Sequence, residues 1–247
     1  MSATKSSPAK VFLSAEWRYL AMLNYEIDPA VLASFVLACT ELDFWNGKTL
    51  ISLVGFLFQN ARVGGIPIPF HRNFEEVNLR FYVRRKADDG RRRGVVFIKE
   101  LVPRRVIAFV ARRFYNEDYF ALPMSHRIEK DRGEIKSVSY FWQPNGQRNF
   151  MKVTVRGQAQ PLVDGSFQEF ITEHYWGYAK QRDGSTMEYR VEHPRWRVWE
   201  IQAAECRCDA ADLYGENFGG LFDQPPASAL LADGSEIKVY QGVKLTT

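Results

Sequence analysis

Cysteine is scarce in this chain of 247 residues, which contains only Cys39, Cys206 and Cys208. An odd number of cysteines argues against a disulfide framework and indicates free thiols in a reducing compartment. Residues 1–10 lack the apolar segment of a secretory signal, so we expect them to form a disordered tail. These absences favour a cytoplasmic protein.

Long apolar runs are also absent. In the first half of the chain the longest spans residues 31–38 and is interrupted by Ser34, which is far short of the roughly 18 residues that a membrane-spanning helix needs. No Gly/Ser-rich linker, repeat or low-complexity tract divides the sequence. With 46% hydrophobic and 25% charged residues, the composition is that of a globular protein. We therefore expect one domain over residues 11–247, with no membrane association.

Familiar catalytic motifs are missing as well. The sequence has no phosphate-binding glycine loop, no Gly-x-Ser-x-Gly elbow, no His-Glu-x-x-His and no dinucleotide fingerprint. Its four histidines are dispersed, and Cys206 and Cys208 lack the further ligands that a metal site requires. We expect no cofactor and no metal, while enzymatic activity and oligomeric state stay open.

Turn signals are plentiful, and they separate runs of aromatic and β-branched residues. Asn-Gly and Asp-Gly pairs tolerate the positive φ angles of tight turns, so they predict β-hairpins. The fold class that follows is α+β, with a mostly antiparallel sheet. The pairs are Asn46-Gly47, Asp89-Gly90, Asn145-Gly146, Asp183-Gly184 and Asp233-Gly234. Predicted strands include residues 50–58, 77–84, 136–142, 150–156, 175–181, 186–191 and 196–206.

Residues 94–102 are apolar on both faces and predict a central strand that is covered on both sides. Helices are fewer but have recognisable start signals. Asp28 before Pro29, Ser166 with Glu169 three residues later, and Asp209 each predict a helix N-terminus. Pro103 predicts a further helix, with apolar residues between Val106 and Phe114 facing inward.

Positive charge is concentrated in residues 84–93, which hold six lysines and arginines against two aspartates. The simplest interpretation is a solvated hairpin tip that resists aggregation. Two alternatives are that this tip binds an acidic protein partner or an anion. Nucleic acid is an unlikely partner.

Lys99 is the most unusual single residue, because a lysine in an apolar, two-sided strand must reach solvent, pair with a carboxylate or face a pocket. Burial would lower its pKa and make it a candidate catalytic amine. A strand-end lysine that reaches solvent or pairs with Glu75 or Glu76 is the simpler alternative. Glu100 should point to the opposite face.

Two further segments contain candidate binding residues. If the polar face of strand 77–84 turns toward a cavity, Asn78 and Arg80 line it and Arg80 can hold a carboxylate. An outward, solvated orientation of this face is slightly favoured. In the segment 172–178, His174 and Tyr178 would share one face of a strand. That face could be the wall of a pocket, or its aromatic residues could close the end of the sheet.

Several phrases taken together resemble the YqjF-like family of uncharacterised conserved bacterial proteins. They are residues 12–18 (FLSAEWR), 52–56 (SLVGF), 74–80 (FEEVNLR), 94–99 (GVVFIK) and 172–177 (TEHYWG). The resemblance covers nearly the whole chain. It implies a fold similar to that of acetoacetate decarboxylase, a barrel or cone of antiparallel strands around a cavity with a few flanking helices.

The resemblance does not bring the decarboxylase mechanism with it. That enzyme uses a Schiff-base lysine, one of two adjacent lysines after a proline, and here Pro103 is followed by Arg104 and Arg105. Arginine cannot form the required iminium. The function we expect is binding of a small anionic organic molecule in the cavity by Arg80, Lys99, His174 and Tyr178. A keto-acid lyase that uses Lys99 and an interaction protein that uses the 84–93 tip are alternatives.

Overall fold

The computed structural model describes residues 10–67, 72–104 and 118–245. The expected N-terminal tail and the helix expected after Pro103 lie outside these ranges, except for Lys10 and the residues at 103–104. Secondary structure in the described chain is dominated by β-strands, with three short α-helices. The predicted α+β class with a mostly antiparallel sheet is confirmed.

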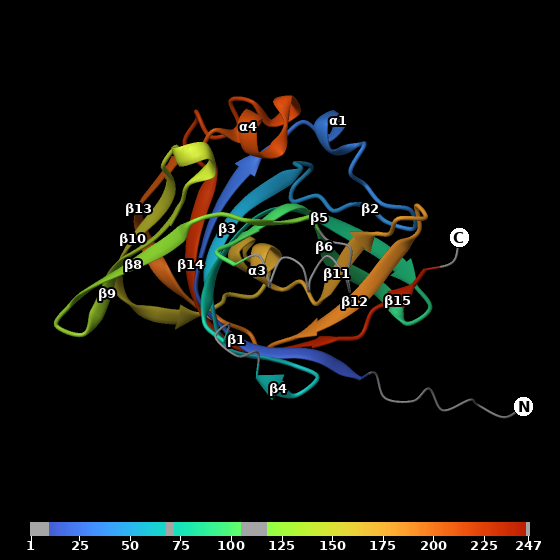
Figure 1. The fold of residues 1–247 in the computed structure, drawn as a ribbon, viewed down its shortest axis with the longest axis horizontal. Helices are drawn as coiled ribbons and strands as arrows, with labels where there is room; N and C mark the ends of the chain where they lie inside the picture. Colours follow the sequence, from blue (N-terminus) through green and yellow to red (C-terminus); the bar gives the residue numbers. More distant parts are fainter. Residues whose placement is uncertain (1–9, 68–71, 105–117, 246–247) are drawn as a thin grey trace, which may run out of the picture.

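Seven strands form a closed ring. Neighbouring strands pair in the order β12-β11-β6-β5-β3-β1-β14, and β14 pairs back onto β12 through Val191↔Val239 and Glu192↔Lys238 (Figure 1). All these pairings are antiparallel except that of β6 with β11. The members of the ring are β1 (Val11–Glu26), β3 (Leu50–Val63), β5 (Phe74–Ala87), β6 (Gly90–Val102), β11 (Trp176–Lys180), β12 (Thr186–Glu192) and β14 (Ser228–Tyr240).

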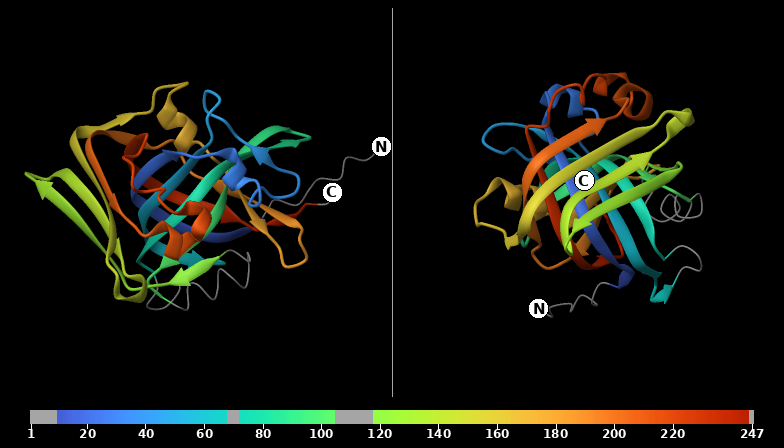
Figure 2. Two further views of the ribbon diagram at one scale, coloured as in Figure 1. Left: turned by 90° about the horizontal axis from the view of Figure 1, so that it is seen from above. Right: turned by 90° about the vertical axis from the view of Figure 1, so that its left-hand side faces the viewer.

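Four more strands continue the sheet beyond β14 and fold over one side of the ring. We call them the outer sheet: β13 (Arg197–Arg207), β10 (Asn149–Pro161), β9 (Glu134–Trp142) and β8 (Met124–Asp131), in that order. Figure 2 shows them as a layer of their own. Short strands β2 (Glu41–Leu42), β4 (Ile66–Pro67), β7 (Tyr119–Ala121) and β15 (Val243–Lys244) pair with β5, β3, β6 and β12.

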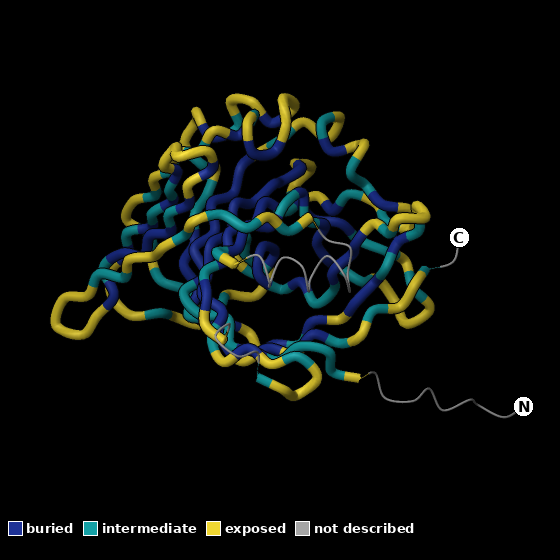
Figure 3. Tube along the Cα trace, viewed as in Figure 1, coloured by how far each residue is buried: buried dark blue, intermediate teal, exposed yellow. Residues whose placement is uncertain are grey.

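The apolar core has two parts, one on each face of the ring wall. One part lies between the ring and the outer sheet, and the other lies inside the ring. Figure 3 shows that buried residues are concentrated along the strands of the ring. The layers approach closely at Gly55 of β3, where an added Cβ would lie 2.6 Å from the Tyr140 ring and 2.9 Å from Met151 Sδ. A larger side chain at this position would therefore force the ring and the outer sheet apart.

β5 shows the effect of this two-sided burial. Val77, Leu79 and Phe81 are fully buried against the outer-sheet side, so the polar face of the strand turns into the ring. The slightly favoured outward, solvated orientation of that face is therefore wrong. Alternation identified which residues share a face, but the polar face is the one that looks into the ring.

β6 is central, as its two apolar faces predict. It pairs with β5 on one side and with β11 and β7 on the other, and most residues from Gly94 to Val102 are buried. A register shift in its pairing with β5 falls between Leu79 and Arg80. Beyond it, Lys99 pairs with Leu79 and Glu100 with Asn78, so Lys99 and Glu100 face opposite sides as expected.

Four of the five turn signals lie between strands or bridged residues. Asn46-Gly47 lies between the bridged residues Trp45 and Lys48. The pairs at 89–90, 145–146 and 183–184 join β5 to β6, β9 to β10 and β11 to β12. The hairpin predicted at Asp233-Gly234 is wrong, because both residues lie inside β14.

The three helix caps are confirmed. Asp28 accepts a hydrogen bond from Ala30 N at the start of α1 (Pro29–Leu32). Ser166 accepts one from Glu169 N at α3 (Phe167–Thr172), and Asp209 accepts one from Asp212 N at α4 (Ala210–Tyr214). Each helix is short, with four, six and five residues in α1, α3 and α4.

No helix in the described ranges is long and apolar enough to cross a membrane.

Candidate functional site

The ring encloses a cavity of about 140 Å³. Its wall is mostly apolar, and a small number of polar side chains from β5, β6 and the segment after α3 interrupt it. This combination is typical of sites for small organic molecules. The aromatic part of the wall includes Trp17, Phe56, Phe58, Phe74, Tyr189 and Trp196.

Two carboxylates and an amide form a polar patch on this wall. Glu76, Asn78 and Glu100 are each only 2% exposed. Asn78 Nδ2 donates to Glu76 Oε1 at 3.0 Å, and the Tyr119 hydroxyl donates to Glu76 Oε2 at 3.4 Å. Asn78 lies opposite Glu100 in the β5–β6 register. Backbone pairing therefore fixes the patch in place.

Arg80 is two residues further along β5 and lines the same cavity. Its Nε is buried and has no hydrogen-bond partner among the described residues. Nη2 lies 3.8 Å from the Met22 sulfur, a weak acceptor, and Cζ lies 5.9 Å from the centre of the Tyr82 ring. No carboxylate in the described ranges forms an ion pair with Arg80. The guanidinium therefore has donors available to an anion.

A chain of buried hydroxyl and amide groups supports Tyr82 behind Arg80. The Tyr82 hydroxyl lies 2.5 Å from Ser52 Oγ, and Ser52 Oγ donates to Asn24 Oδ1 at 2.6 Å. Because Ser52 has one proton to donate, the Tyr82 hydroxyl is the donor to Ser52. Burial raises the pKa of Tyr82, and the nearby Arg80 charge opposes that rise. Tyr82 is a neutral, fixed neighbour of Arg80.

His174 lines the cavity from the segment that follows α3. Its ring lies 4.7 Å from that of Tyr82 and 5.8 Å from that of Phe170, centre to centre. Neither ring nitrogen makes a hydrogen bond of normal geometry within the described part of the chain. Burial, followed by the charges of Arg93 and Arg80, lowers the pKa of His174 well below its usual value. A neutral His174 offers one donor and one acceptor.

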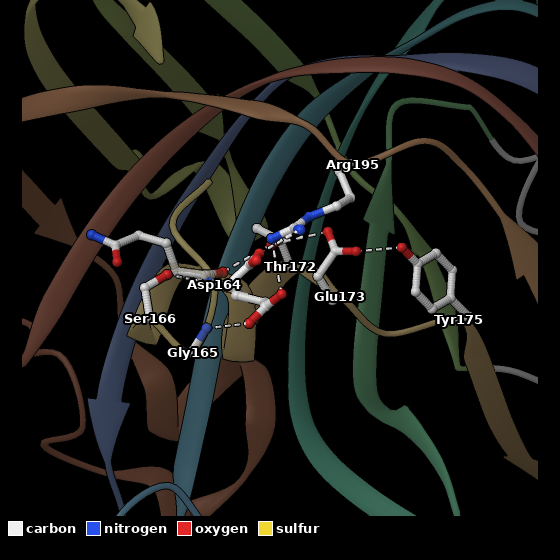
Figure 4. A network of polar contacts seen from close by, with 9 residues as sticks. Asp164, Gly165, Ser166, Thr172, Glu173, Tyr175 and Arg195 are labelled. Atoms are coloured by element: carbon white, nitrogen blue, oxygen red, sulfur yellow. Dashed lines mark hydrogen bonds and ion pairs between the residues drawn. The ribbon is translucent and has the colours of Figure 1, made fainter. Parts of the chain in front are cut away.

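α3 and residues 173–175 cover one end of the ring, as Figures 1 and 2 together show. Thr172 and His174 line the cavity. The Tyr175 hydroxyl donates to the Glu173 carboxylate (Figure 4), and neither of these two residues lines the cavity. On the surface, Arg195 forms ion pairs with Asp164 at 2.7 Å and Glu169 at 2.8 Å.

Arg93 anchors this segment from the other side. It donates to Asp43 at 2.7 Å and to the Phe170 carbonyl at 3.3 Å, and its guanidinium lies over the Phe170 ring. The segment that carries His174 is thus held by side chains on both sides.

Lys99 and Tyr178 do not join this cavity. The Lys99 side chain leaves the opposite face of β6, where Nζ donates to the Leu213 carbonyl and lies 4.5 Å from the centre of the Phe120 ring. Tyr178 is 1% exposed and belongs to the core between the ring and the outer sheet. Of the four expected ligand-binding residues, the structure brings Arg80 and His174 together and places Lys99 and Tyr178 elsewhere.

Several cavity residues were not proposed from the sequence. Glu76 shares a strand face with Arg80, and Glu100 lies opposite Asn78, so alternation and pairing would have connected them. Trp17 and His193 gave no usable signal, because their positions depend on how the ring closes.

The basic hairpin tip at residues 84–93 is largely neutralised within the protein. Arg84 pairs with Glu41 at 2.7 Å, and Arg85 pairs with the buried Glu188 at 3.2 Å. Arg92 pairs with Glu188 and also with Asp89, and it lies 4.0 Å from the centre of the Trp176 ring. Arg93 pairs with Asp43, so four arginines of the tip form ion pairs within the protein.

Within the described part of the chain, Cys206 and Cys208 have no surroundings typical of a metal site. No group of three or more histidine, cysteine, aspartate or glutamate residues with the geometry of a metal site occurs in the described ranges. Burial raises the pKa of Cys206 to about 12 and also raises that of Cys208, so both thiols are protonated and unreactive at neutral pH.

The fold is similar to that of acetoacetate decarboxylase and related solved structures. The enduracididine biosynthesis enzyme MppR, complexed with pyruvate, matches with a TM-score of 0.71 and 12% identity over 98% of this chain and 93% of its own. Acetoacetate decarboxylase from Legionella pneumophila matches with a TM-score of 0.67 and 12% identity, over 100% and 98% of the two chains. At such identities the likeness shows the fold alone.

The sequence then identifies the family. The chain belongs to the DUF2071 family, described as an uncharacterized conserved protein, whose model matches residues 14–236. YqjF from Bacillus subtilis (strain 168) is 29% identical over 192 residues, which is 76% of this chain and 74% of YqjF. The resemblance to YqjF-like proteins and to the decarboxylase fold is confirmed.

Proposed function

We propose that the cavity of the ring binds a small organic molecule with an anionic group, which Arg80 holds. The carrying observation is the buried, unpartnered Nε of a guanidinium that lines an otherwise mostly apolar cavity. Arg80 as a whole is only partly buried, but its Nε has no acceptor, and a bound carboxylate would supply one in a charge-assisted hydrogen bond. His174 adds a neutral donor or acceptor next to it.

The rest of the cavity fits the organic part of such a molecule. Aromatic rings of β1, β3 and β5 supply an apolar surface, and the Glu76–Asn78 patch supplies acceptors and a donor on the same strand as Arg80. The cavity of about 140 Å³ limits the ligand to a few heavy atoms. A short keto or hydroxy acid meets these requirements, and the structurally similar MppR is named in a complex with pyruvate.

No observation favours the alternative of a Schiff-base enzyme that uses Lys99. The described residues around the cavity include no lysine, and the Lys99 amine lies beyond the opposite face of β6. Arg104 occupies the first of the two positions where the decarboxylase-like enzyme needs a lysine, and Arg105 lies outside the described residues. Partner binding by the 84–93 tip has less support, because most of its arginines have internal partners.

A single domain over residues 11–247 and a cytoplasmic location are also part of this proposal. The family match across residues 14–236 and the three free cysteines are consistent with them.

Calorimetric titration tests the ligand class. Pyruvate, acetoacetate and 2-oxobutyrate are titrated into the wild-type chain, R80Q and R91Q, with acetone and pyruvamide as uncharged comparisons. We expect R80Q to weaken binding of the acids by about tenfold or more, because a hydrogen-bonded charge is lost. R91Q changes an exposed arginine of the hairpin tip and should bind like the wild type.

Two results would contradict the proposal: binding of the acids that R80Q leaves unchanged, and no binding of any acid at millimolar concentration. Borohydride added to each mixture also tests for an amine adduct. We expect no adduct at Lys99. An adduct at this residue would support the alternative of a Schiff-base enzyme.

A further inference from the structure

The outward face of the outer sheet, away from the cavity, has two phenylalanines side by side on its central strands. Phe141 of β9 lies directly opposite Phe150 of β10 in the strand register. Both are only partly buried, because they lie on the face turned away from the core. Their ring centres are 6.3 Å apart, with an angle of 38° between the ring planes. Figure 2 (right) looks onto this layer.

Basic side chains surround these rings. A shallow hollow on this face is lined by the two phenylalanines, Ser139, four cations and one carboxylate, that of Glu129. Glu129 is already occupied, since it pairs with Arg127 at 3.0 Å and accepts from Ser137 at 2.7 Å. The four cations are Arg127, Arg148, Lys152 and Arg207.

Three of these cations have no ion-pair partner in the described ranges: Arg148, Lys152 and Arg207. They come from three places, the β9–β10 connection, β10 and β13, so they flank the rings on different sides. Glu205 of β13 lies opposite Lys152 in register but does not line the hollow. The hollow therefore has an excess of positive charge that the hairpin tip, with its internal ion pairs, lacks.

The Phe141 ring presents its flat face to this charge. Arg148 Cζ lies 4.7 Å from the centre of the Phe141 ring, in a cation–π contact. The guanidinium of Arg148 thus lies over the Phe141 ring, on the side where a nucleobase would stack. Arginine and aromatic faces are the two kinds of side chain on which unpaired bases stack.

We propose that this face of the outer sheet binds single-stranded nucleic acid, with bases on Phe141 and Phe150 and phosphates on Arg148, Lys152 and Arg207. A four-stranded antiparallel sheet with partly exposed aromatic rings on its two central strands is a suitable platform, because every base has a flat face. A duplex keeps its bases stacked inside and can use only the charges. This surface differs from the hairpin tip on which the expectation against nucleic acid was based, and it does not depend on the proposed cavity ligand.

Fluorescence anisotropy tests the proposal with a labelled oligothymidylate about a dozen nucleotides long, a length within the usual site size of about 4–16 nucleotides. We expect binding at about 50 mM salt that weakens as salt is raised. The double variant F141L/F150L keeps apolar volume but removes the rings, and it should bind about tenfold more weakly. K152Q/R207Q should bind more weakly and show a shallower dependence on salt.

K86Q/R91Q is the matched control, because it removes two cations of the hairpin tip and should bind like the wild type. A duplex of equal length should bind more weakly than the single strand. Circular dichroism of each variant confirms that the sheet is intact.

Three outcomes would overturn the proposal. They are binding by F141L/F150L that equals that of the wild type, competition by polyglutamate as strong as that by unlabelled oligonucleotide, and no binding of the oligonucleotide at low salt. The first two would identify plain attraction of polyanions, including acidic proteins, and the third would leave this face without a nucleic-acid role.

Discussion

His174 and His193 are both held neutral at the cavity wall, although they reach it from different segments. Burial is the largest cause of the lowered pKa in each case. The His193 ring lies between Tyr175 and Trp196, with ring centres at 4.8 and 4.2 Å. Neutral imidazoles beside Arg80 leave the guanidinium as the positive charge that an incoming anion meets first.

This burial predicts a pH dependence of stability. In the unfolded chain both histidines have a pKa near 6.5, and in the folded chain the pKa is lower, so below about pH 6.5 the unfolded state binds more protons. The free energy of unfolding should therefore fall as pH is lowered from 7 to 5, by up to about 1.4 kcal/mol per pH unit for each histidine.

H174Q removes one of these two sites, so its urea-unfolding free energy should fall less steeply over the same pH range than that of the wild type. Carboxylates titrate similarly in both proteins and cancel in the comparison. Parallel curves for H174Q and the wild type would show that the pKa of His174 in the folded state is the same as in the unfolded state.

At the scale of secondary-structure elements, β14 connects the two layers of the molecule. Its first part pairs with β13 through Leu231 and Ala232, and its last part pairs with β12 through Lys238 and Val239. Gly234 lies between these parts with a φ of 80°. The Asp-Gly pair that predicted a hairpin thus marks the place where β14 passes from the outer sheet to the closure of the ring.

Gly234→Ala should destabilise the protein strongly. An added Cβ would lie 1.9 Å from the Trp17 carbonyl oxygen of β1, and the backbone has the positive φ that disfavours alanine. Gly65 is a matched control, because its φ is 83° and nothing lies within 4 Å of an added Cβ. We expect a loss of about 1 kcal/mol for G65A and roughly 3 kcal/mol or more for G234A.

Urea denaturation of the two variants measures this difference. Equal losses would mean that β1 moves away from residue 234 at little cost, and that the passage between layers does not depend on glycine.

Local signals were sufficient to predict where the helices start. Asp28, Ser166 and Asp209 cap their helices because a cap needs only a side-chain oxygen and the next turn of backbone. β1 and β14 were not predicted as strands, although they are among the longest. Their pairing with each other joins opposite ends of the chain, which no local pattern records.

For the whole molecule, the arrangement of layers implies unequal local stability. β3 and β5 each have strand neighbours on both sides and apolar cores on both faces. β8 lies at the edge of the outer sheet and, among the described strands, pairs only with β9. Edge strands lose fewer contacts when they open than strands within a ring.

Native-state hydrogen exchange should show this difference. Amides of β3 and β5, such as those of Leu53 and Leu79, should exchange only through global unfolding and respond steeply to low concentrations of denaturant. The β8 amides that pair with β9 should exchange faster and with little response to denaturant. Equal protection in β8 and β5 would show that the ring and the outer sheet unfold as one unit.

The sequence alone was sufficient for the features that depend on neighbours along the chain: the strand-rich α+β class, four turns, three helix caps and the central position of β6. It also showed that Arg80 shares a strand face with Asn78 and that Lys99 opposes Glu100. Tertiary structure decided which of those faces looks into the cavity, because a ring wall with a core on each side buries both. It placed Arg80 inside and Lys99 outside, and it brought Asp43 and Glu188 to the arginines of the hairpin tip.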